Sequence, residues 1–74
     1  MKLTKDQFYV LHALSLLFTG LGRINSPELQ QTAIELSRNG LISDIYEHTD
    51  GAISCRIADA GRVALQGAEH DQQG

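Results

Sequence analysis

The sequence predicts a small α+β domain whose elements follow the order helix, helix, β-hairpin, helix. Two helix-start signals lie in the first half of the chain, and an Asp-Gly turn between two apolar strands lies in the second half. A last helix is expected from Ala60 to about Gln66, ended by Gly67. A chain of 74 residues forms one domain. We expect it to span residues 1–67, with residues 68–74 as a polar, disordered tail.

The first helix is expected to begin after Thr4 and to run to about Phe18. Gln7 follows Thr4 at the spacing of a capping box, and Gly20 is the candidate for the C-terminal cap. This helix is apolar nearly all round, because its main stripe is matched by apolar residues on the opposite side. The main stripe holds Val10, Leu11, Leu14, Leu17 and Phe18, and the opposite side holds Tyr9, Ala13 and Leu16.

Ser26 and Pro27 predict the start of the second helix, because serine is a favoured N-cap and proline a favoured first helical residue. Asn39-Gly40 ends this helix. Only the short segment Thr19–Asn25 separates it from the first helix, so we expect no further helix between the two.

Asp50-Gly51 predicts a hairpin with a two-residue turn, in which Thr49 pairs with Ala52. Side chains alternate between the two faces of a strand, so this register also predicts which face is buried. The buried face would hold Ile42, Tyr46, Ile53, Cys55 and Ile57, together with Asp44 and His48. The outer face would hold Ser43, Ile45, Glu47, Ser54 and Arg56.

The segment LQQTAIELSRNGLI, the hairpin and the segment RIADAGRVAL together resemble the C-terminal half of winged-helix regulators of the MarR and PadR kind. Such regulators share a Leu-x-x-x-Gly-Leu-Ile run before the wing and a Thr-x-x-Gly motif after it. The matching residues here are Leu36, Gly40, Leu41, Ile42 and Gly61, whereas Ala58 replaces the threonine. The resemblance covers about residues 3–66. It implies a winged helix that lacks one helix of the helix-turn-helix pair, and it implies DNA binding by a transcriptional regulator.

The charge distribution bears on that function. The chain carries six basic and nine acidic residues, a formal charge of −3, so it gains little from the phosphate backbone that supplies most non-specific DNA affinity. Gln and Arg on the second helix are able to bond base edges, but Glu28 and Glu35 on the same face repel phosphates. The side chains expected to face DNA or a protein partner are Gln30, Gln31, Ile34 and Arg38 on this helix, and His48 and Arg56 on the wing.

The first helix indicates a different function, because a helix that is apolar all round must be covered on both sides. Two further helices and a hairpin do not suffice to wrap it. We therefore expect a subunit interface at Tyr9, His12, Ala13 and Leu16. The leading hypothesis is a non-catalytic binding or regulatory module that acts through protein–protein contact, as a homodimer or as a subunit of a larger assembly. The alternative is a DNA-binding regulator of the winged-helix type.

Other classes of function lack a signal. His12, His48, His70 and Cys55 do not have metal-ligand spacing, so we expect no metal and no other cofactor. No catalytic groups are paired, so we expect neither an enzyme nor a small-molecule substrate. The apolar run Phe8–Phe18 is shorter than the roughly 20 residues that span a bilayer, and no signal-peptide cleavage site follows it. A cytoplasmic protein is expected, of the kind found among small bacterial or phage proteins.

Overall fold

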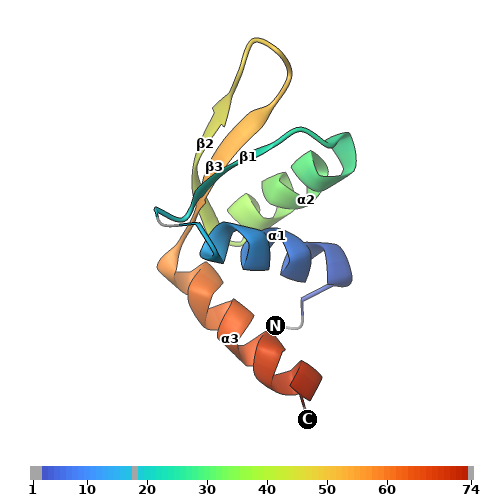
Figure 1. The fold of residues 1–74 in the computed structure, drawn as a ribbon, viewed down its shortest axis with the longest axis vertical. Helices are drawn as coiled ribbons and strands as arrows, with labels where there is room; N and C mark the ends of the chain where they lie inside the picture. Colours follow the sequence, from blue (N-terminus) through green and yellow to red (C-terminus); the bar gives the residue numbers. More distant parts are fainter. Residues whose placement is uncertain (1–2, 18, 74) are drawn as a thin grey trace.

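The structure, a computed structural model, describes the backbone of residues 3–17 and 19–73 and the side chains as far as residue 68. Three antiparallel strands form one sheet in the order β1-β3-β2, and three helices accompany it (Figure 1). The α+β class is confirmed, although the described sheet has one strand more than the expected hairpin. The elements are α1 (Lys5–Ser15), β1 (Leu21–Ile24), α2 (Pro27–Arg38), β2 (Ile42–Glu47), β3 (Ile53–Ile57) and α3 (Asp59–Gln73).

The starts of α1 and α2 agree with the sequence signals. The backbone N–H of Gln7 donates to the Thr4 hydroxyl at 3.2 Å, and the Gln7 side chain accepts from the backbone N–H of Thr4 at 2.9 Å. This capping box is confirmed. α2 begins at Pro27 after Ser26, whose side chain makes no capping hydrogen bond. α1 ends at Ser15, earlier than expected, and its predicted end at Phe18 lies outside the described residues.

β1 occupies the segment that was expected to be a plain connection between two helices. It pairs antiparallel with β3, and Gly22 lies opposite Cys55. A Cβ atom at Gly22 would lie 2.5 Å from a methyl carbon of Leu14 and 2.9 Å from one of Leu17. Glycine is therefore what lets α1 pack directly against the backbone of β1.

The predicted register of the hairpin is wrong. The backbone N–H of His48 donates to the carbonyl of Ala52 at 2.8 Å, so the loop has three residues and ends on Gly51, whose φ is +91°. A three-residue loop that ends on a positive-φ glycine is the next common hairpin after the two-residue turn. This loop sets Tyr46 opposite Ser54, and the Tyr46 side chain is 63% exposed. A bulge between Ser43 and Tyr46 then shifts the register again, so that Ile42 lies opposite Ile57. The expectation that Tyr46 is buried is therefore wrong, and Asp44 at the bulge is exposed as well.

The core lies between the helices and the inner face of the sheet, where Leu11, Leu36 and Cys55 are fully buried. α3 joins this core through Leu65 and leaves the body at the end opposite the hairpin tip (Figure 1). α3 continues to Gln73, so the expectation that Gly67 ends it is wrong. Within the described residues, no helix combines the length and the apolar character needed to cross a membrane.

Candidate functional site

The outward side of α1 is apolar and exposed, as the sequence predicted. Val10, Leu11 and Leu14 are buried, whereas Tyr9 is 59% exposed and Leu16 72% exposed. Leu17 and Leu21 are also exposed, on the segment that leads from α1 into β1. We call this region the α1–β1 surface, and it consists of Tyr9, Ala13, Leu16, Leu17 and Leu21. Groups of exposed apolar side chains are typical of binding sites on soluble proteins.

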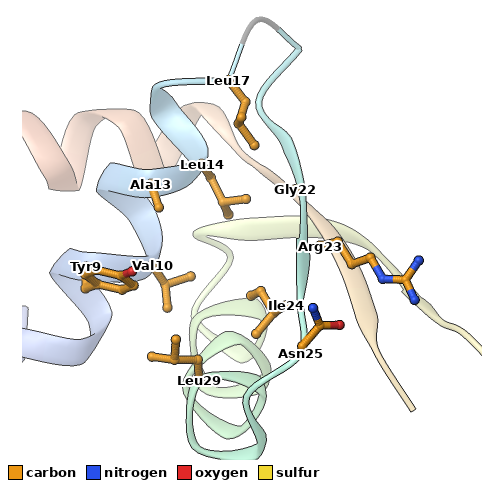
Figure 2. Close-up of a pocket in the computed structure, with 10 residues that line it drawn as sticks. All are labelled: Tyr9, Val10, Ala13, Leu14, Leu17, Gly22, Arg23, Ile24, Asn25 and Leu29. Carbon is orange, nitrogen blue, oxygen red and sulfur yellow. The ribbon is translucent and has the colours of Figure 1, made fainter. Parts of the chain in front are cut away.

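A groove of about 210 Å³ lies between α1, β1 and the first turn of α2. Figure 2 shows the side chains of Val10, Leu14 and Ile24 directed toward it from these elements, whereas the Arg23 side chain points away. Pockets for small ligands usually measure about 300–1,000 Å³. The groove is therefore better suited to a few apolar side chains of a protein partner than to a small molecule.

The charges around the α1–β1 surface have both signs. Arg23 forms an ion pair with Asp50 of the hairpin loop. The pKa of Asp50 is lowered below its usual value, first by the backbone N–H of Ala52, which donates to the Asp50 carboxylate at 3.1 Å, and then by the charge of Arg23. Lys5 and Asp6 are adjacent exposed residues of opposite charge at the start of α1, and the Arg62 guanidinium lies close to Gly20, just before β1. The surface is thus apolar, with charged side chains at its margins.

α2 does not present all the side chains that were expected to face a partner. The Gln30 amide donates to the backbone carbonyls of Ile24 and Gly51, at 2.9 Å each. The expectation that Gln30 faces DNA or a protein is therefore wrong, because this amide ties α2 to β1 and to the hairpin loop. Ile34 is half-buried, and the exposed side chains on this helix include Gln31, Arg38, Glu28 and Glu35.

The two wing residues lie on the outer face of the sheet. His48 Nε2 is 2.5 Å from Ser54 Oγ, and Tyr46 packs edge-on against the His48 ring with centroids 4.9 Å apart. A guanidinium nitrogen of Arg56 is 3.9 Å from a carboxylate oxygen of Asp44. His48 is therefore in contact with neighbouring side chains on the sheet, and Arg56 lies beside Asp44.

The remaining candidates do not form a reactive site. His12 is half-buried, and its ring stacks on Phe8 with centroids 5.6 Å apart, so it lies at the margin of the α1–β1 surface. Cys55 is fully buried, and burial raises the pKa of its thiol. The described residues hold no group of three side chains suited to bind a metal ion.

Comparisons of the chain with models of known protein families, with curated proteins and with solved structures found no match. The site is therefore defined by its geometry. Sequence reasoning found Tyr9, Ala13 and Leu16 but placed Leu17 on the buried stripe, although it is 43% exposed. It also missed Leu21 and the groove, which depend on β1. The segment Leu21–Ile24 carries little strand signal, because Gly22 within it and Gly20 just before it disfavour a strand.

Proposed function

We propose that this protein is a non-catalytic binding or regulatory module that acts through protein–protein contact, and that its partner binds the α1–β1 surface. One observation carries the proposal. Among the described residues, four of the seven exposed large hydrophobic side chains lie on or next to α1 and β1, beside an apolar groove: Tyr9, Leu16, Leu17 and Leu21. Water-exposed leucines grouped in this way are stabilised when a partner covers them.

The scaffold that we propose for this module is a winged helix reduced by one helix. The order α1, β1, α2, β2, β3, α3 is compatible with it, as is Gly61, which fits closely against the backbone of Leu41 at the base of the hairpin. A cytoplasmic location is part of the proposal and is supported by the single cysteine, which is buried as a free thiol.

The DNA-binding alternative has less support. Base readout by α2 would need free amide and guanidinium groups, but Gln30 is engaged inside the domain. Glu28 and Glu35 remain exposed on the same helix, and Arg56 lies beside Asp44. A salt titration of binding to random duplex DNA tests the alternative. Tight binding with a steep negative salt dependence would overturn the preference for protein contact.

The docking surface is tested by crosslinking in the native host, followed by purification and identification of the attached chains. Leu16→Glu places a charge in the centre of the surface. Val63→Glu is its control, because Val63 is similarly exposed at 68% but lies on α3. We expect the crosslinked chains to be lost with Leu16→Glu and kept with Val63→Glu. The same chains recovered with both variants would rule out the α1–β1 surface as the contact.

A further inference from the structure

We propose that the α1–β1 surface is self-complementary, and that a second copy of this chain covers it by pairing β1 with β1 about a two-fold axis. The inference rests on the proposed function, because it names the partner of the same surface. The two sheets then form one six-stranded sheet, and the two copies of α1 lie side by side on its inner face. The partner of this contact is thus a second identical chain.

The two edges of the sheet differ in how they are protected. β2 carries a bulge at which Asp44 has a φ of +56°, and Glu47 follows on the same strand. Bulges and charged side chains are features by which edge strands avoid pairing with other chains. β1 pairs with β3 without irregularity, contains no proline, and its one charged side chain, Arg23, is held by Asp50. Of the two edges in the described sheet, β1 is the open one.

The backbone groups of β1 have a defined direction. The N–H of Ile57 donates to the carbonyl of Gly20 at 2.9 Å, and residues of an antiparallel ladder alternate between facing the paired strand and facing away. Gly22 and Ile24 therefore face β3, whereas the N–H and C=O groups of Leu21 and Arg23 face the open edge. The Leu21 N–H donates to the Thr19 hydroxyl at 3.3 Å within the chain, a long hydrogen bond that pairing with a second strand replaces. Pairing centred on Gly22 sets Leu21 opposite Arg23 of the second copy, and each such pair exchanges both backbone hydrogen bonds.

The side chains are consistent with this arrangement. Leu21 and Arg23 lie on the outer face of the sheet, so the aliphatic part of Arg23 covers the exposed Leu21 of the second copy. On the inner face, α1 contacts both β1 and β3. With strands about 4.8 Å apart, a helix above these two strands lies about 5 Å from the axis, so the two copies of α1 are about 10 Å apart, as packed helices are. The small Ala13 lies at the centre of the exposed stripe and permits this approach.

The area is that of a stable dimer. Taking a whole tyrosine or leucine side chain as roughly 200 Å², the exposed fractions of the α1–β1 surface amount to about 400–450 Å² of apolar area. Two copies then bury about 850 Å² of apolar surface, which is the apolar share of an interface of about 1,600 Å² in total. On β1 the one charged side chain, Arg23, is paired with Asp50, so the two copies of the strand meet without repulsion between unpaired charges.

Sedimentation of the full chain from micromolar to millimolar concentration tests the helix contact. We expect a dimer. Leu16→Glu should raise its dissociation constant by at least about 100-fold, because the symmetry places the buried charge in the interface twice. Val63→Glu should leave the dimer unchanged, and circular dichroism checks that both variants are folded.

The strand contact is tested at Arg23. Arg23→Pro removes an N–H that faces the open edge, at a position where an edge strand tolerates proline. Arg23→Ala is the control, because it loses the same ion pair with Asp50 and keeps the N–H. We expect Arg23→Pro to be a monomer and Arg23→Ala a dimer. In the wild type, hydrogen exchange of the Leu21 and Arg23 amides should slow as the protein concentration rises.

A wild-type monomer at millimolar concentration overturns the second-copy proposal, and so does a dimer that is indifferent to Leu16→Glu or has no concentration-dependent protection of the β1 amides. The crosslinking experiment separates this failure from failure of the proposed function. If the wild type is a monomer and its native partner is lost with Leu16→Glu, the docking surface stands and only the second-copy proposal is rejected. If the wild type is a monomer and its partners are unaffected by Leu16→Glu, both proposals are rejected.

Discussion

Replacing Gly61 by alanine tests how closely α3 packs against the base of the hairpin. A Cβ atom at Gly61 would lie 2.2 Å from the carbonyl oxygen of Leu41 and 3.0 Å from the Ile57 side chain. The Leu41 carbonyl is not free to move away, because it accepts a hydrogen bond from the backbone N–H of Ala58 at 3.0 Å. The alanine methyl group therefore has to push the helix off the hairpin.

The magnitude follows from two opposing effects. At an open helical position, the change from glycine to alanine stabilises by about 1 kcal/mol. At Gly61, close carbon–oxygen contacts are about 3.3 Å, so α3 and Leu41 must separate by roughly 1 Å. This overpacking costs about 1–3 kcal/mol, and loss of the Ala58 hydrogen bond about 1 kcal/mol more. We expect a net loss of about 1–3 kcal/mol, from a total of about 4–11 kcal/mol for a chain of this length.

Urea unfolding followed by circular dichroism measures the effect, at a single protein concentration so that association does not confound the comparison. Gly67→Ala is the control, because Gly67 lies in the same helix and a Cβ there meets no atom within 4 Å. This variant should be more stable than the wild type by up to about 1 kcal/mol. The same substitution thus has opposite signs at two positions of α3. If Gly61→Ala is as stable as the wild type, the close packing is refuted.

Three further predictions concern single side chains. Gln30→Ala leaves two backbone carbonyls without their donor and should lower the free energy of urea unfolding by about 1–3 kcal/mol. The control Gln31→Ala should change it by less than about 0.5 kcal/mol, and equal effects of the two variants would contradict the bracing role of Gln30. The pKa of Asp50 is lowered mainly by the backbone N–H of Ala52, so the ionised form of Asp50 favours folding. This contribution is complete above the unfolded-state pKa near 4 and disappears as the pH falls through the lowered pKa. Asp50→Asn should therefore reduce the loss of stability below about pH 4, and an unchanged pH profile would count against this contact. Burial raises the pKa of the Cys55 thiol, so a thiol reagent should label it in proportion to the unfolded fraction; rapid labelling in native buffer would show that it is accessible.

The features that the sequence predicted correctly are local ones. The capping box of Thr4 and Gln7 lies within one helical turn, and Ser26-Pro27 defines the start of α2 by its own backbone preferences. β1 was missed for the opposite reason. Gly22 lowers the local preference for a strand, but it is required by Leu14, a residue of another element. Leu14 is near Gly22 in the sequence, but their contact arises only once the chain turns back between α1 and β1, which the local preferences of the strand do not encode.

The hairpin shows how one additional loop residue changes which side chains of a strand are buried. Asp50-Gly51 fits a two-residue turn, and the same pair also fits the end of a three-residue loop, because glycine adopts positive φ in both. A shift of one residue moves every side chain of a strand to the other face. The three-residue loop therefore places Tyr46 on the outer face, whereas the bulge at Asp44 brings Ile42 back to the buried face. Local turn chemistry does not decide between the two loops.

The α1 part of the candidate site was predictable from the sequence, and the reason also supports its role as a binding surface. A chain of 74 residues has too little mass to cover an α1 that is apolar all round, so exposure of Tyr9 and Leu16 follows from composition and length. The other part depends on β1 and so on tertiary structure. Gln30 holds the end of β1 and the hairpin loop against α2 through its amide. One of the α2 side chains expected to face DNA or a partner thus positions the edge strand instead, which weakens the case for base readout and leaves the α1 side, where a subunit interface was expected, as the proposed contact.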